Sequence, residues 1–135
     1  MNELTLDAVV ENIPHVIDFV NSHLEGIACP AKVQRKIDIA IDELFSNIAR
    51  YAYYPNVGSV TVCVAVRKDP ASVVISFIDC GVPYDPLAKR DPDTTLSAEE
   101  REIGGLGIFL VKQSMDDIQY EYKDGQNILQ IFKRF

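Results

Sequence analysis

The sequence predicts one α+β domain, a two-layer α/β sandwich in which the helices and a sheet share one buried face. Three observations support this fold class. The chain has 135 residues, of which 47% are hydrophobic and 24% charged, a balance typical of a single globular core. Segments with helical apolar spacing are interspersed with segments of period two. The strands come in pairs joined by short turns, which favours hairpins over a doubly wound parallel sheet.

The first part of the chain is expected to form a short edge strand and two helices. Residues 2–6 alternate as a strand would. The apolar spacing of residues 9–24 predicts a helix that stops at Gly26. Pro30 suits a first helical turn, so a longer helix is expected over residues 31–53. Its apolar stripe consists of Val33, Ile37, Ile41, Leu44 and Ile48.

Two strands follow a turn at residues 55–58. Residues 59–67 alternate with a period of two, which predicts a strand. A turn at residues 68–70 leads to a second strand over residues 71–79. That strand is apolar on both faces, so we expect it at the centre of the sheet.

The last third of the chain begins with a polar stretch, residues 81–103, which is too long for a simple connection. It is either a functional lid or a surplus length of loop without a function. A helix is expected over residues 108–115, followed by strands over residues 118–122 and 128–132. The intervening Asp124-Gly125 pair is a strong signal for a hairpin turn.

Charge and hydropathy argue against two classes of partner. The chain has 13 Lys and Arg residues against 20 Asp and Glu, a net charge of −7, and no basic run, so nucleic acid is not an expected partner. No apolar stretch approaches the roughly 18–20 residues of a membrane span. The acidic start of the chain does not resemble a signal peptide. We therefore expect a cytoplasmic protein that does not bind membranes.

The cysteines, Cys29, Cys63 and Cys80, are odd in number. They lack the paired spacing, or the nearby histidines, of a zinc site or a redox motif. We therefore expect three buried thiols in a reducing compartment.

The first candidate site lies on the long predicted helix. Glu43 and Asn47 are four residues apart and hence side by side, at the edge of the apolar stripe, with Arg50 close to Glu43 on the other side. A carboxylate and an amide there could hold a hydrated divalent cation or orient a nucleophile. The alternative is a solvated helix edge.

The second candidate is Asp79, which continues the inward phase of its strand. A carboxylate that points into an apolar layer is costly unless a hydrogen-bond donor meets it, and the exocyclic amine of a planar base is one such donor. The alternative is an acid at the strand end that its own backbone satisfies, helped by the turn at Gly81.

The third candidate is a glycine-rich turn before an apolar helix, formed by Gly104, Gly105 and Gly107. Bare backbone N–H groups at a helix N-terminus suit an anion such as phosphate. A flexible hinge is the alternative. A dinucleotide fingerprint is excluded because a loop, not a strand, precedes the glycines and the third spacing is absent. Together, the three candidates supply the parts needed to hold a nucleoside triphosphate.

At these residues the sequence resembles the GHKL ATPase superfamily, and within it the small bacterial anti-sigma factor serine/threonine kinases. Three boxes carry the resemblance: residues 42–53 (DELFSNIARYAY), 79–86 (DCGVPYDP) and 104–111 (GGLGIFLV). The resemblance implies one histidine kinase-like ATPase domain over residues 1–135, with a nucleotide lid at about 82–103. It also implies a mixed, mainly antiparallel sheet with helices on one face.

The family's roles carry over onto the matching residues. Glu43 would be the general base, Asn47 the protein ligand of Mg²⁺, and Asp79 the acceptor for the adenine amine. Gly81 would allow the turn beneath the base. The glycines at 104, 105 and 107 would line the phosphates, and Arg50 or Arg101 would reach them. Tyr51 stands where many of these kinases have histidine, and His15 and His23 are interpreted as ordinary helix residues.

The resemblance therefore implies an ATP-binding, Mg²⁺-dependent protein kinase. It would bind a sigma factor or a similar regulator and phosphorylate a serine or threonine of a small antagonist protein, and it allows for a homodimer. Two alternatives remain open at this point. One is an ATP-responsive binding module that sequesters its partner and transfers nothing. The other is an α+β scaffold whose glycine turn is only a hinge.

Overall fold

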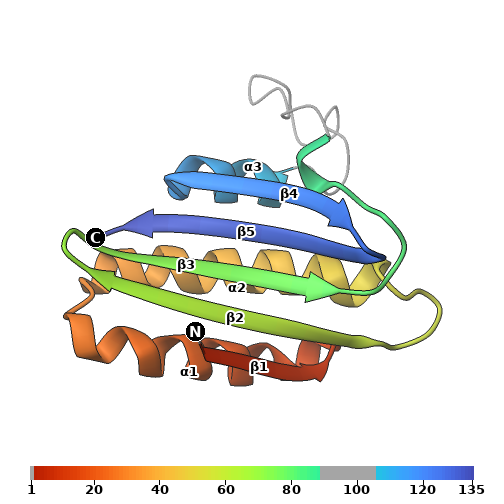
Figure 1. Ribbon diagram of the computed structural model, residues 1–135, viewed down its shortest axis with the longest axis horizontal. Coiled ribbons are helices and arrows are strands. Elements are labelled where there is room, and N and C mark those ends of the chain that lie inside the picture. Colours follow the sequence, from red (N-terminus) through yellow and green to blue (C-terminus); the bar gives the residue numbers. More distant parts are fainter. Residues whose placement is uncertain (1, 89–105) are drawn as a thin grey trace.

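The computed structural model describes residues 2–88 and 106–135, which form an α+β fold with one five-stranded sheet (Figure 1). The strands are β1 (Asn2–Asp7), β2 (Ser59–Lys68), β3 (Ala71–Asp79), β4 (Asp117–Lys123) and β5 (Gln126–Arg134). Their order in the sheet is β1-β2-β3-β5-β4, so β3 is central, as predicted. Each of the four pairings described is antiparallel, so this part of the chain shows no parallel component of the expected mixed sheet.

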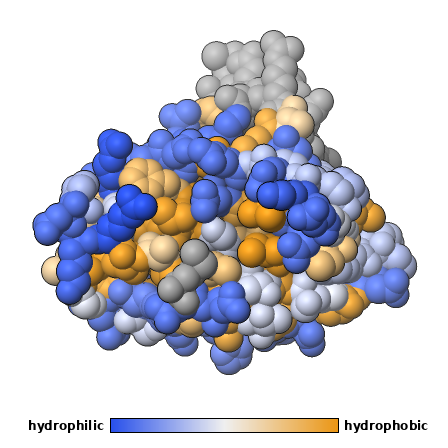
Figure 2. All heavy atoms as spheres, in the orientation of Figure 1, coloured by the Kyte–Doolittle hydropathy of each residue, from blue (hydrophilic) through white to orange (hydrophobic). Residues whose placement is uncertain are grey.

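In the described part of the chain, three α-helices cover one face of the sheet: α1 (Ile13–Leu24), α2 (Ala31–Tyr51) and α3 (Leu106–Ser114). In Figure 1 they lie behind the strands, with α2 passing behind the centre. The opposite face carries the outward phase of the strands, in which the apolar side chains Val74, Ile78, Ile128 and Phe132 are only half-buried. Figure 2 shows this face, where hydrophobic residues near the centre are surrounded by hydrophilic ones.

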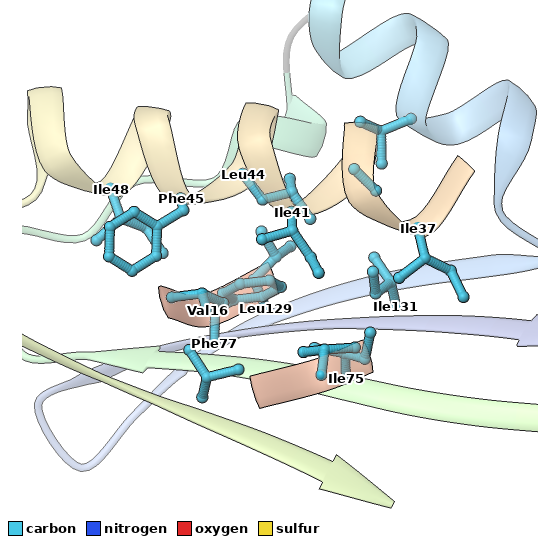
Figure 3. Close-up of a cluster of buried hydrophobic side chains, with 14 of the residues drawn as sticks. Val16, Ile37, Ile41, Leu44, Phe45, Ile48, Ile75, Phe77, Leu129 and Ile131 are labelled. Atoms are coloured by element: carbon cyan, nitrogen blue, oxygen red, sulfur yellow. The ribbon is translucent and has the colours of Figure 1, made fainter. Parts of the chain in front are cut away.

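The core lies between α2 and the inward phase of the central strands. The register places Val62, Phe77 and Leu129 in one row, and Val64, Ile75 and Ile131 in the next. From α2, Ile37, Ile41, Leu44, Phe45 and Ile48 pack onto these rows, and all are buried (Figure 3). Each buried side chain of this kind contributes roughly 1.5–3 kcal/mol relative to leaving it exposed. This layer fixes α2, and with it the helix edge that carries Glu43 and Asn47.

The helix boundaries differ from the predicted ones in all three helices. The helix α3 covers Leu106–Ser114 rather than residues 108–115. A 3₁₀ turn, Val10–Asn12, precedes α1, where the apolar spacing predicted helix from residue 9. The reason is Pro14, which is tolerated only in the first turn of an α-helix because it has no N–H to donate. The long helix α2 ends at Tyr51 rather than at residue 53.

The β4–β5 connection agrees with its sequence signal. Asp124 and Gly125 form a two-residue turn, and both have positive φ angles, 54° and 77°. This is the backbone conformation of the type I′ turn that an Asp-Gly pair favours. The turn fixes the register that places Asn127 opposite Tyr122 on β4.

The expectation of three buried thiols is wrong for two of the cysteines. All three are free, but only Cys63 is buried, whereas Cys29 is half-buried and Cys80 is exposed. Cys80 follows Asp79 at the end of β3, so its side chain alternates to the side away from the core. Burial raises the pKa of the Cys63 and Cys29 thiols. Within the described ranges, no helix combines the length and the apolar character that crossing a membrane requires.

Candidate functional site

A pocket lies between α2, the end of β3 with the residues that follow it, β4 and the start of β5. Its apolar wall includes Leu44, Ile48 and Leu129. Its polar groups come from Asn47, Asp79, Tyr84, Tyr120 and Asn127. An apolar cleft with a few convergent polar groups is the usual form of a small-molecule site.

Asp79 is the acid of this pocket and is only 4% exposed. Its Oδ1 accepts two hydrogen bonds, from the backbone N–H of Gly81 and from Nδ2 of Asn127, both at 2.9 Å. The backbone N–H of Gly81 thus satisfies part of one carboxylate oxygen, as expected for an acid at a strand end that its own backbone satisfies. The other oxygen, Oδ2, has no hydrogen-bond partner among residues 2–88 and 106–135. A buried carboxylate therefore keeps one acceptor for a donor that enters the pocket.

Gly81 brings the chain after β3 under the C-terminal end of α2. The N–H of Val82 donates to the carbonyl of Ala52 at 2.9 Å. A Cβ atom on Gly81 would lie 2.2 Å from the same carbonyl oxygen. No side chain fits at this position, which agrees with the predicted tight turn.

Glu43 and Asn47 lie side by side on α2, as their spacing predicts. Asn47 Nδ2 donates to Glu43 Oε1 at 3.4 Å, so the amide oxygen of Asn47 is left for another partner. The Glu43 carboxylate also meets the first turn of α3, where a Cβ atom on Gly107 would lie 2.2 Å from its Cδ. The N-terminus of a helix favours a negative charge. The predicted base and one predicted phosphate glycine are therefore in contact.

Arg50 is not brought into the pocket. Its Nε donates to the carbonyl of Ser46 at 3.2 Å, and its guanidinium lies 5.9 Å from the centre of the Tyr51 ring. The Tyr51 ring in turn lies 5.6 Å from that of Tyr84 at the rim of the pocket. The other residues expected to contact phosphate, Arg101, Gly104 and Gly105, lie outside the described residues.

Sequence reasoning did not identify Asn127 and Tyr120 as site residues. Asn127 is 5% exposed and Tyr120 is half-buried, and burial raises the pKa of the Tyr120 hydroxyl. A signal was present for Asn127, because it is a polar residue in the inward phase that Leu129 and Ile131 continue. That signal points to the site only once β5 is known to pair with β3, and the chain order does not reveal this pairing.

No described cluster of three or more His, Cys, Asp or Glu side chains could hold a metal ion.

Comparisons with known proteins show which proteins this chain is similar to. The chain is 33% identical over 95 residues to the serine-protein kinase RsbW of Bacillus cereus, which covers 67% of this chain and 58% of that protein. It is 26% identical over 99 residues to the serine/threonine-protein kinase BtrW of Bordetella bronchiseptica, covering 73% of this chain and 69% of that protein. The chain thus spans less than two thirds of the length of the Bacillus relative.

Solved structures share the fold. A Mycobacterium tuberculosis protein with RsbU and RsbW domains matches with a TM-score of 0.64 and 17% identity, over 99% of this chain and 32% of that one. The SiaB–SiaC complex from Pseudomonas aeruginosa matches with a TM-score of 0.59 and 16% identity, over 98% of this chain and 89% of that one. Residues 6–133 match the model of the histidine kinase-like ATPase domain, and the chain belongs to that family.

Proposed function

We propose that this chain binds Mg-ATP in the pocket and transfers the γ-phosphoryl group to a serine or threonine hydroxyl of a regulatory protein. The observation that carries the proposal is the free Oδ2 of Asp79, an acceptor with no partner among the described residues, on a buried acid in a mainly apolar cleft. The exocyclic amine of adenine meets this acceptor, whereas guanine offers a carbonyl at the corresponding position. We therefore expect ATP to bind in preference to GTP.

The phosphates would extend from this pocket toward Asn47 and the start of α3. Asn47 supplies an amide oxygen for Mg²⁺, and Gly107 supplies a backbone without a side chain at the first turn of the helix. By the family resemblance, Gly104, Gly105 and Arg101 complete the phosphate site. The chain has a net charge of −7, so the cation and the helix terminus must offset the charge of the triphosphate.

Glu43 is the proposed general base. Its carboxylate lies between Asn47 and Gly107, at the end of the site where the γ-phosphate would be. It accepts the proton of the incoming hydroxyl. The hydroxyl oxygen then forms a bond to the γ-phosphorus, while the bond from that phosphorus to the bridging oxygen breaks and ADP leaves. Bound Mg²⁺ supplies charge neutralisation at the phosphates. Positioning and electrostatics account for most of phosphoryl-transfer catalysis.

The relatives suggest the kind of partner. Those that match in sequence are named serine-protein or serine/threonine-protein kinases, and the similar SiaB structure was solved as a complex with SiaC. We propose that this chain acts in the cytoplasm on a small antagonist protein, binds a sigma factor or a similar regulator, and forms a homodimer. Its three free thiols suit a reducing compartment.

Calorimetric titration with Mg-ATP tests the binding step. We expect the wild type and Glu43→Gln to bind with the same affinity within about threefold, because the base does not contact adenine. Asp79→Asn should weaken binding by about tenfold or more, because it removes a charged hydrogen-bond acceptor. Equal ATP affinities in the wild type and Asp79→Asn would contradict the adenine site.

Labelled ATP tests the transfer step. The protein is incubated with Mg-ATP labelled at the γ-phosphate and with the candidate antagonist encoded beside it in the genome. Wild type should label a serine or threonine of the antagonist, and Glu43→Gln should not. Binding of Mg-ATP without any labelled antagonist over many hours would overturn the kinase proposal and favour an ATP-responsive binding module.

A further inference from the structure

Asn127 is the most densely bonded side chain of the pocket, and the proposed reaction assigns it no role. It lies on β5 directly opposite Asp79 on β3. Its Nδ2 donates to Asp79 Oδ1 and to the carbonyl of Val82, both at 2.9 Å, and lies 3.5 Å from the carbonyl of Gly81. Its Oδ1 accepts from the backbone N–H of Tyr84 at 3.2 Å and from the Tyr120 hydroxyl.

These partners fix the orientation of the amide. The groups around Nδ2 are a carboxylate and carbonyl oxygens, which only accept hydrogen bonds. Oδ1 faces a backbone N–H, which only donates. A flipped amide would place an oxygen against acceptors and an NH₂ group against a donor. The orientation of Asn127 therefore follows from its hydrogen bonds.

The number of hydrogen-bonding groups on the amide limits how Asn127 can act. An asparagine amide has two donor hydrogens and two acceptor lone pairs, and the protein already engages all four. None remains for a ligand, although the residue lines the pocket. Asn127 must therefore act on a bound molecule through Asp79 and the start of the loop after β3, not by direct contact.

The hydrogen bonds of Asn127 reach both Asp79 and the loop after β3. With Gly81 N–H and Asn127 Nδ2 both on Oδ1, the Asp79 carboxylate has one preferred rotation, and Oδ2 is left facing the pocket. The bonds to Val82 and Tyr84 hold the first residues of the loop after β3. The amide thus couples the acid to the start of this loop.

Tyr120 completes the arrangement from the edge strand β4. Its side chain is in the inward phase, opposite Leu129, and its hydroxyl donates to Asn127 Oδ1 while accepting from the N–H of Tyr84 at 3.2 Å. Removing this hydroxyl would leave Asn127 in place with one bond fewer.

We propose that Asn127, oriented by Tyr120, is a positioning residue that aims the free oxygen of Asp79 at the amine of the bound base and so sets the preference for a base that carries this amine. The inference rests on the proposed function, because it concerns how that pocket selects its nucleotide. It does not depend on phosphoryl transfer.

The test compares the affinity for Mg-ATP with that for the Mg complex of purine riboside triphosphate, which lacks only the 6-amino group. The wild type should prefer ATP by about tenfold or more. Asn127→Asp has nearly the same shape but loses both donors. It should lower ATP affinity by about tenfold and bring the ratio of the two affinities close to one. A purely structural role would lower both affinities together and leave the ratio unchanged.

Tyr120→Phe is the milder second variant, in case Asn127→Asp does not fold. It should reduce the ATP preference about threefold, in the same direction. Tyr122→Phe is the matched control, because Tyr122 lies two residues along the same strand and is 46% exposed. For Tyr122→Phe, the ratio of the affinity for Mg-ATP to that for the purine riboside triphosphate complex should equal that of the wild type.

The outcomes separate this inference from the function on which it rests. If the wild type binds neither nucleotide, or binds both equally, the proposed adenine site falls and the inference falls with it. If the wild type prefers ATP, and folded Asn127→Asp and Tyr120→Phe keep the full preference, the adenine site stands and the positioning role is overturned.

Discussion

Asp79 shows how a buried side chain can be stabilised by hydrogen bonds and still keep an acceptor for a ligand. A buried carboxylate with no partners would be costly, and one with all its acceptors filled could bind nothing. Here two donors converge on Oδ1 and leave Oδ2 for the pocket. The sequence predicted the inward direction of Asp79 from the period of its strand. It could not predict the Asn127 donor, which comes from a strand 48 residues later in the chain.

Two glycines of the site should respond differently to alanine. At Gly81 the added Cβ would lie 2.2 Å from the carbonyl oxygen of Ala52 and 2.6 Å from its carbon, and this backbone cannot move without disturbing the end of α2. We expect Gly81→Ala to reduce the free energy of unfolding by about 2 kcal/mol. Gly26→Ala is the control, because nothing lies within 4 Å of its added Cβ. Urea denaturation that gives equal stabilities for the two variants would contradict the close packing of Gly81.

At Gly107 the obstacle is the end of a side chain. The added Cβ would lie 2.2 Å from Glu43 Cδ and Oε1, and this carboxylate can rotate away. We therefore expect Gly107→Ala to change stability by less than about 1 kcal/mol, yet to lower the rate of phosphoryl transfer by about tenfold or more, since the base leaves its position. Single-turnover transfer measured beside urea denaturation checks both parts. An unchanged rate of phosphoryl transfer would contradict the proposed role of Glu43 as the base.

At the scale of elements, the strands were predictable and their arrangement was not. Period-two patterns located β2 and β3, and the Asp-Gly turn located the β4–β5 hairpin. The insertion of β5 between β3 and β4 depends on packing far apart in the sequence. That insertion brings Asn127 and Tyr120 to the pocket, which explains why both were missed. Arg50 was placed on the correct helix, but its guanidinium folds back over Tyr51.

The end of α3 is tied to β5 by an acid with a measurable pH signature. Asp116 Oδ2 accepts from the backbone N–H of Arg134 at 2.6 Å and lies 3.5 Å from the ammonium of Lys133. The Arg134 N–H, with Lys133 adding to it, holds the pKa of Asp116 below its ordinary value. The stability from a depressed carboxyl pKa is present above the unfolded-state value, near 4, and is lost as pH falls through the folded-state value.

Asp116→Asn should therefore lower the free energy of unfolding at pH 6, and the difference from wild type should shrink as pH falls below about 4. Denaturation curves of both proteins between pH 6 and pH 3 measure this difference. A deficit that stays constant over that range would show that the charge of Asp116 does not contribute.

At the scale of the whole molecule, three segments far apart in the chain meet around one pocket. They are the second half of α2, the end of β3 with the residues that follow it, and the β4–β5 hairpin, which contributes Tyr120, Asn127 and Leu129. The sequence predicted the members on α2 and β3 and the class of fold, because local patterns and short boxes encode them. It could not predict the pocket's floor, which only the completed sheet creates.

The most direct test of this convergence is an amide NMR titration of the isotopically labelled protein with Mg-ATP. The account predicts that chemical-shift changes concentrate at Asn47, at residues 79–84, at Gly107 and at Asn127. The hollow beside His23, Gly26 and Lys68, on another part of the molecule, should not respond. Changes confined to that hollow, or none at residues 79–84 under saturating Mg-ATP, would contradict the central claim.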